Sequence, residues 1–226
     1  IDCPTWDSVV AATAPMAGSP VRDGNELATI IYTSGTTGMP KGVMQSFATF
    51  AWSIGAVRKR LEIDEHSRIL SYLPLAHVAE RTLVEHGLLA GGMHVYFADS
   101  LATFASDLQR ARPTIFFSVP RLWVKFQQGV LAKMPAARLD RLLGIPIVRS
   151  IVAKKVLRAI GLDHCKVAGG GAAPMPPELL QWYRRLGLRL SEVYGMTENC
   201  GVSHATLPEL PRPGTVGVPY DGVKSR

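Results

Sequence analysis

The feature of this sequence that most constrains its fold is a regular alternation of short apolar runs with longer segments of helical periodicity. The first apolar run covers residues 27–32, and the run at 114–119 lies between two prolines, as a buried strand would. The helical segment after the first run places five apolar residues on one face: Phe47, Phe50, Ile54, Val57 and Leu61. This alternation predicts an α/β fold with a mostly parallel sheet flanked by helices.

Other segments continue the pattern. Further strands are expected at residues 68–73, 93–97, 166–168 and 189–193. Helices are expected at 78–90, 101–112, 121–134, 138–160 with a break at Pro146, and from about 176 onward. Residues 1–26 contain turn formers and no sustained period, so they are interpreted as a connecting segment before a core at 27–226.

Composition excludes some classes of protein. The chain has 226 residues, 47% of them hydrophobic, which suffices for a sizeable core. No apolar run is long enough to span a membrane, and three widely spaced cysteines indicate reduced thiols without a structural metal. These features favour a soluble, cytoplasmic protein.

The net charge is +7, and the positive residues come in short clusters within helix-like segments. Solvated helix faces explain such clusters better than nucleic-acid binding does. Attraction of an anionic ligand or of an anionic membrane surface stays open.

The strongest chemical signal is the string Tyr32-Thr-Ser-Gly-Thr-Thr-Gly-Met-Pro-Lys-Gly42, directly after the first expected strand. Its glycines allow close backbone approach, its hydroxyls donate hydrogen bonds, and its lysine adds a positive charge, as a phosphate cradle requires. Pro40 before Lys41 and Gly42 after it rule out a Walker loop.

This string resembles the phosphate-binding signature of the adenylate-forming superfamily, which includes acyl-CoA synthetases, luciferases and the adenylation domains of peptide synthetases. The resemblance implies a flexible loop, Thr33 to Lys41, that closes over the phosphates of ATP. The residues it assigns to this loop are Thr33, Ser34, Gly35, Thr36, Thr37, Gly38 and Lys41.

A second segment, Tyr194-Gly-Met-Thr-Glu198, follows an expected strand and matches another motif of that family. Chemically, an aromatic ring can stack on adenine, a hydroxyl can contact a phosphate, and a carboxylate can hold Mg²⁺. The resemblance therefore implies that Tyr194 and Gly195 bind the nucleotide, that Thr197 contacts the α-phosphate, and that Glu198 binds the metal.

Two more segments resemble the family. In the segment Gly169-Gly-Gly-Ala-Ala-Pro174, the resemblance assigns Gly170, Gly171 and Ala172 to the adenine and acyl pockets. The alternative interpretation of this segment is a plain strand-to-helix turn without a ligand. In Tyr72-Leu-Pro-Leu-Ala-His77 a structural histidine is the alternative, and the resemblance makes His77 the residue that orients the acid.

The sequence around His77, which continues to Glu80 and Arg81, resembles the long-chain fatty acyl-CoA synthetase branch of the family. The run from Pro113 to Trp123 resembles the same branch. The function implied is a long-chain fatty acid–CoA ligase that uses ATP, Mg²⁺ and CoA, with Lys41, His77, Thr197 and Glu198 as catalytic residues. A fatty acyl-AMP ligase that loads a carrier protein and a non-catalytic nucleotide-binding fragment are the alternatives. Peripheral membrane contact and homo-oligomer formation stay open.

In the family, a ribose-binding aspartate, a hinge and a small mobile carboxy-terminal domain follow the segments matched here. Residues 27–226 are therefore expected to form a partial ATP- and acyl-binding core, without that carboxy-terminal domain. The isolated fragment is expected to be inactive, because contacts to the developing charge of the reaction would be missing.

Overall fold

The computed structural model describes residues 3–34, 38–207, 212 and 214–225. Its largest sheet has the strand order β5-β6-β7-β8-β9. The strands β5 (Ile115–Ser118), β6 (Val167–Gly170) and β7 (Leu190–Tyr194) are parallel, whereas β8 (His204–Ala205) and β9 (Val218–Pro219) are antiparallel additions. The α/β class is confirmed, and the sheet is mixed because its last two strands run antiparallel.

A second parallel pair lies beside this sheet. The strands β3 (Arg68–Ser71) and β4 (His94–Phe97) pair in register along their length. The backbone N–H of Arg68 donates to the Thr114 hydroxyl at 2.8 Å, and the Thr114 N–H donates to the Arg68 carbonyl at 2.9 Å. These bonds join β3 to the start of β5, so the carboxyl ends of β3, β5, β6 and β7 face the same way.

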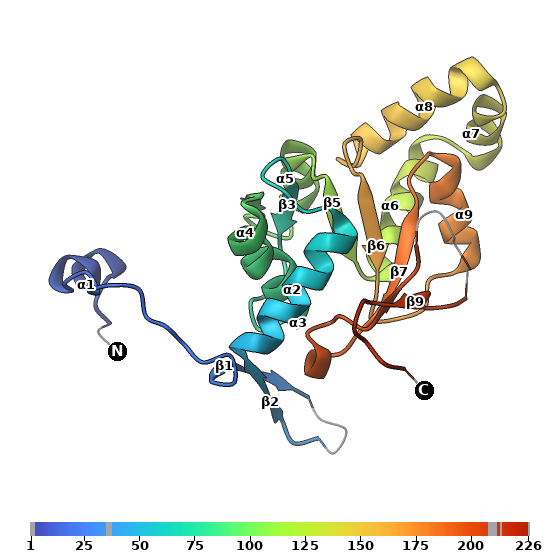
Figure 1. The fold of residues 1–226 in the computed structure, drawn as a ribbon. Coiled ribbons are helices and arrows are strands. Elements are labelled where there is room, and N and C mark those ends of the chain that lie inside the picture. Colours follow the sequence, from blue (N-terminus) through green and yellow to red (C-terminus); the bar gives the residue numbers. More distant parts are fainter. Residues whose placement is uncertain (1–2, 35–37, 208–211, 213, 226) are drawn as a thin grey trace.

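Helices connect these strands and cover the sheet (Figure 1). Among them are α2 (Phe47–Leu61), α5 (Phe104–Ala111) and α6 (Pro120–Lys133). The two helices α7 (Ala136–Leu143) and α8 (Pro146–Ala159) lie together at one end of the molecule, and α9 (Pro177–Arg185) precedes β7. The expected break at Pro146 is confirmed, because proline occupies the first turn of α8.

The core has two main parts. One surrounds the fully buried Trp123, whose ring lies edge-on to Phe116 and Tyr183. The indole N–H donates to the Gly169 carbonyl, and the Tyr183 hydroxyl donates to the Trp123 carbonyl, so the polar atoms of both rings are paired. The second part packs α2 against β3 and β5 through Ile54, Val57 and Ile69.

The first expected strand is present, but an unexpected strand lies between it and the helix that follows. Residues 27–33 form β1 (Leu27–Thr33), but β1 pairs antiparallel with β2 (Lys41–Ser46) in a separate two-stranded sheet. The sequence predicted no strand at 41–46, because glycine and polar residues interrupt its apolar pattern. Figure 1 shows this hairpin projecting from the amino-terminal end of α2.

Two further elements were not expected. The connecting segment 1–26 contains α1 (Trp6–Ala12), a seven-residue helix capped by Thr5 and with no buried residue. The helix expected at 78–90 is divided into α3 (Val78–Glu80), a π-helical turn η1 (Arg81–Glu85) and α4 (His86–Gly91). Among the described residues, no helix has the length and apolar character needed to cross a membrane.

Candidate functional site

The phosphate-loop segment lies at the end of the β1–β2 hairpin. Thr33 is paired with Lys41 in the ladder, and the Thr33 hydroxyl donates to the Lys41 carbonyl at 3.4 Å. Lys41 and Ser34 are exposed, and Gly38 has a φ of +81°, which favours glycine. Three of the predicted loop residues, Gly35, Thr36 and Thr37, lie outside the described residues.

One contact joins this hairpin to the second motif. The side-chain amide of Gln45, on β2 and only 2% exposed, donates a 2.6 Å hydrogen bond to the backbone carbonyl of Thr197. Sequence reasoning did not select Gln45. No local pattern indicates its burial, because no strand was expected at 41–46.

The second motif continues from β7 into a short 3₁₀ helix, η2 (Thr197–Asn199). The Asn199 side-chain oxygen accepts the Met196 N–H at 2.9 Å, which fixes the turn. Tyr194 is 45% exposed and Glu198 is exposed, so both side chains are available to a ligand. A Cβ on Gly195 would overlap the backbone of Gly201, so only glycine fits there.

The glycine run ends β6 and turns beside β7. A Cβ on Gly170 would lie 2.8 Å from the Met175 sulfur, and one on Gly171 would lie 2.9 Å from the Val193 carbonyl oxygen. Ala172 has a φ of +66°, an uncommon value for a residue with a side chain. The absence of side chains at the two glycines therefore allows close packing of the chain at the carboxyl end of the sheet.

His77 caps the amino-terminus of α3. Its Nδ1 accepts the Ala79 backbone N–H at 3.1 Å, and the ring is exposed. An accepting Nδ1 carries no proton, so the neutral ring holds its proton on Nε2 and can donate from there.

A buried carboxylate supports the loop that carries His77. Glu80 is 3% exposed and accepts a hydrogen bond from the Ser71 hydroxyl. Burial raises the pKa of Glu80, while the Ser71 hydroxyl and the backbone amides of Leu73 and Tyr72 oppose that rise. Sequence reasoning used Glu80 only as part of a resemblance and assigned it no role.

These segments surround a cavity of about 350 Å³ with a largely apolar lining. Its walls come from the His77 loop, the ends of β5 and β7, the glycine turn after β6, and α2. The larger apolar side chains of its lining include Val57, Leu61, Leu73, Val78, Leu83, Phe117, Val119, Leu122, Val193, Met196, Val202 and Tyr220. The cavity thus lies where parallel α/β sheets bind ligands, at the carboxyl ends of the strands.

The cavity brings together only part of the predicted site. Five predicted residues line it: His77, Gly171, Ala172, Gly195 and Thr197. The others are outside its lining; within the described part of the chain these are Thr33, Ser34, Gly38, Lys41, Gly170, Tyr194 and Glu198. Their roles stay predictions.

The chemistry of Glu198 and Thr197 fits a magnesium ion held jointly with a phosphate. Mg²⁺ prefers oxygen ligands and commonly binds through one or two carboxylates together with substrate phosphates. Glu198 supplies one exposed carboxylate and follows Thr197 directly in the chain. The described residues contain no group of three or more His, Cys, Asp or Glu side chains that could hold a metal by themselves.

Comparison with known proteins agrees with this geometry. A family model described as AMP-binding enzyme matches residues 4–226, so the chain belongs to the AMP-binding enzyme family. The chain is 33% identical over 234 residues to the long-chain-fatty-acid–CoA ligase ACSBG2 of Xenopus laevis, with 89% of this chain and 32% of that protein covered. It is 32% identical to long chain acyl-CoA synthetase 2 of Arabidopsis thaliana, with 93% and 36% covered.

Solved structures show the same fold. A malonyl-CoA ligase in a ternary product complex with methylmalonyl-CoA and AMP is 25% identical, with a TM-score of 0.68, and 92% of this chain and 41% of that chain are covered. The A-PCP didomain of a carboxylic acid reductase from Segniliparus rugosus, in complex with AMP, is 29% identical, with a TM-score of 0.66 and coverage of 89% and 28%. The chain spans about a third of the length of the curated relatives it matches.

Proposed function

We propose that this chain forms the nucleotide- and acyl-binding core of an ATP-dependent ligase that activates long-chain fatty acids and transfers them to CoA. The observation that supports this most directly is the apolar cavity, with His77 and Thr197 in its lining at the carboxyl end of the sheet. An apolar chamber suits an acyl chain, and the two polar side chains suit its carboxylate and the phosphate it attacks. The relatives named as long-chain-fatty-acid–CoA ligases support the substrate class.

The reaction proposed has two steps. In the first, a carboxylate oxygen of the acid attacks the α-phosphorus of ATP, the bond to the β-phosphate breaks, and pyrophosphate leaves. In the second, the thiol of CoA attacks the acyl carbonyl, loses its proton, and displaces AMP. Charge on the phosphate oxygens grows in the first step, so fixed donors and cations near those oxygens lower the barrier.

The residues of this chain would divide that work. Lys41 and the Thr33 and Ser34 hydroxyls would hold the outer phosphates, and Thr197 would donate to the α-phosphate. His77 would donate from Nε2 to the acid carboxylate, in agreement with its accepting Nδ1. Mg²⁺ bound by Glu198 would neutralise negative charge on the phosphates.

Pyrophosphate exchange tests the first step. The gene product that contains this chain should exchange labelled pyrophosphate into ATP in the presence of long-chain acids, and much less with short-chain or amino acids. Added CoA should then yield acyl-CoA. No exchange with any acid in the panel would refute the proposed activity. If exchange occurs but the acyl group is transferred only to a phosphopantetheinyl carrier protein, the acceptor is that carrier protein and not CoA.

The role of the cavity needs its own variant. Leu122 lines the cavity from α6, and Leu122→Trp should shift the preferred acid toward shorter chains by filling apolar space. Leu180→Trp, on α9, is a matched control because Leu180 is half-buried and lies outside the cavity lining. An unchanged chain-length profile in the Leu122 variant would argue against acyl binding in this cavity.

A further inference from the structure

The outer face of α8 combines large apolar side chains with basic ones. Ile147 is 81% exposed and Ile151 is 65% exposed, one helical turn apart. Figure 1 shows α8, in yellow, at the end of the molecule opposite the β1–β2 hairpin. This face is therefore far from the hairpin that carries the predicted phosphate loop.

Basic residues continue the same stripe toward the end of the helix. Lys154, Lys155 and Arg158 follow Ile147 at seven, eight and eleven positions, which is the spacing of one helical face. All three are exposed, and none forms a salt bridge within the described parts of the chain. The sequence of α8 contains no acidic residue.

The opposite face fixes how the helix lies. Ala153 and Val156 of α8 are buried and pack with Leu139 and Leu143 of α7. Because those contacts hold α8 on the body of the protein, the stripe from Ile147 to Arg158 faces solvent.

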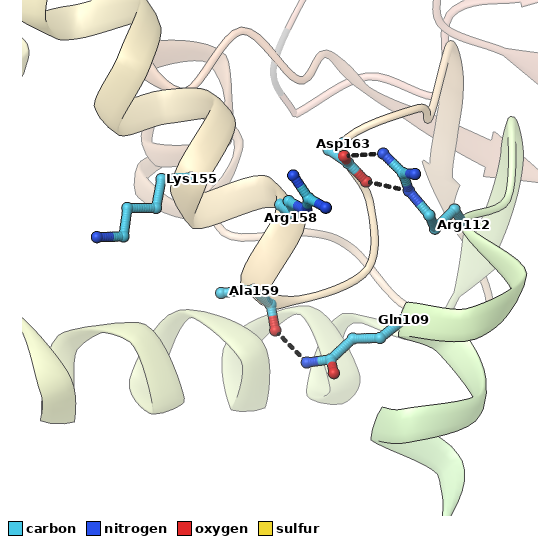
Figure 2. A pocket seen from close by; sticks show the side chains of 6 residues that line it. All are labelled: Gln109, Arg112, Lys155, Arg158, Ala159 and Asp163. Carbon is cyan, nitrogen blue, oxygen red and sulfur yellow. Dashed lines mark hydrogen bonds and ion pairs between the residues drawn. The ribbon is translucent and has the colours of Figure 1, made fainter.

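A groove beside the basic half of α8 adds a recess. It measures about 410 Å³ and is lined by Gln109, Arg112, Lys155, Arg158, Ala159 and Asp163. In Figure 2 the guanidinium of Arg112 is paired with Asp163, at 2.6 Å for the closer contact, and Gln109 donates to the Ala159 carbonyl at 2.6 Å. Lys155 and Arg158 carry no such interaction in this view, so their charges remain available to an anion.

The combination of aliphatic and basic side chains on the outer face of α8 favours one class of partner over others. A face that packs against protein is depleted of lysine, and burying unpaired Lys154 and Lys155 there would carry a desolvation cost. A nucleic acid would use the cations but leave Ile147 and Ile151 without a partner. A bilayer surface accommodates both, because aliphatic groups enter the acyl boundary while long basic side chains reach the headgroup phosphates.

We propose that the outer face of α8 docks on an anionic phospholipid surface, with Ile147 and Ile151 entering the acyl boundary and Lys154, Lys155 and Arg158 contacting lipid phosphates. The groove beside Lys155 and Arg158 receives a headgroup. The proposal is independent of the ligase function, because binding to vesicles requires neither nucleotide nor acid.

Vesicle sedimentation tests the proposal on the purified chain. The chain should bind vesicles of phosphatidylcholine mixed with phosphatidylserine, bind pure phosphatidylcholine vesicles far less, and lose affinity as salt is added. Each basic residue near an anionic surface contributes about fivefold to affinity, so Lys154→Gln with Lys155→Gln should weaken binding about 25-fold. Ile147→Ser with Ile151→Ser should also weaken it.

A matched control has the same change in charge elsewhere. Lys125→Gln with Lys224→Gln alters two exposed lysines outside α8, neither of them in a salt bridge within the described residues, and should leave vesicle binding unchanged. An equal loss in this control would show that net charge alone attracts the chain and would overturn the docking face.

The apolar half of the stripe has its own readout. An environment-sensitive fluorophore on Ile151→Cys, in a Cys3→Ser background, should shift to the blue when phosphatidylserine vesicles are added. Wild-type vesicle binding without this shift would overturn the proposal. The proposal would also be overturned if the variant Ile147→Ser with Ile151→Ser bound vesicles as tightly as wild type and duplex DNA displaced it from them. The stripe would then be a general site for polyanions.

Discussion

The side-chain amide of Gln45 and the backbone carbonyl of Thr197 form a 2.6 Å hydrogen bond between residues 152 positions apart. Gln45 belongs to the hairpin that carries the predicted phosphate loop, and Thr197 belongs to the motif that ends β7. The bond is partly buried: the Gln45 side chain is 2% exposed, and Thr197 is half-buried. It therefore fixes the hairpin relative to one wall of the cavity.

Removing this bond should destabilise the fold and separate the two motifs. Gln45→Ala removes this partly buried bond, and a typical intramolecular hydrogen bond contributes about 0.5–1.5 kcal/mol to stability. The free energy of unfolding from urea titration should fall by about that amount. Gln128→Ala, at an exposed position on α6, should change it by less than about 0.5 kcal/mol. Equal effects of the two variants would contradict the assigned role of Gln45.

Two glycine-to-alanine changes should have opposite signs. A Cβ on Gly195 would overlap the Gly201 backbone, so Gly195→Ala should lower the urea midpoint and displace the turn that holds Thr197. Gly129 lies inside α6 with no atom within 4 Å of an added Cβ. Gly129→Ala should stabilise the protein by roughly 0.5–1 kcal/mol, because alanine favours a helix interior. Stabilisation by both variants would show that the Gly195 turn has room.

Glu198→Gln tests the metal role without disturbing the fold. The amide keeps the shape of the side chain but removes the charge that would hold Mg²⁺, so adenylation should fall most at limiting Mg²⁺ and recover in part at high Mg²⁺. Pyrophosphate exchange by the gene product that contains this chain measures it. Glu178→Gln, at another exposed carboxylate, should match wild type at every Mg²⁺ concentration. A Glu198 variant that also matched wild type would exclude this role.

The ion pair of Arg112 with Asp163 should make stability depend on pH. The Arg112 guanidinium beside Asp163 holds the pKa of that carboxyl below its usual range. A lowered carboxyl pKa stabilises the fold above the pKa of the unfolded chain, and this contribution is lost as the pH falls from about 5 toward 2. Asp163→Asn should therefore have a lower free energy of unfolding than wild type at pH 7, as measured by urea titration. This difference in free energy should shrink as the pH is lowered. A constant difference across that range would show that the charge is not involved.

Much of the fold class and the choice of candidate segments followed from local pattern. The periodicity of strands and helices and the positions of Pro113, Pro120 and Pro146 are local features of the sequence. The strands β3 to β7 were therefore predicted near their observed positions. The family resemblance depends on short strings of residues, and the match to the AMP-binding enzyme family confirms it. The residue roles within those strings remain predictions.

What local pattern could not supply is how distant segments meet. The antiparallel pairing of β1 with β2, the burial of Gln45 and Glu80, and the composition of the cavity wall all depend on contacts between segments far apart in the chain. A polar side chain in a strand looks the same in sequence whether it faces water or a buried carbonyl. Only packing decides whether water or another residue satisfies its hydrogen bonds. For this reason the segments of the site were visible in the sequence, while the residues that hold them together appeared only in the tertiary structure.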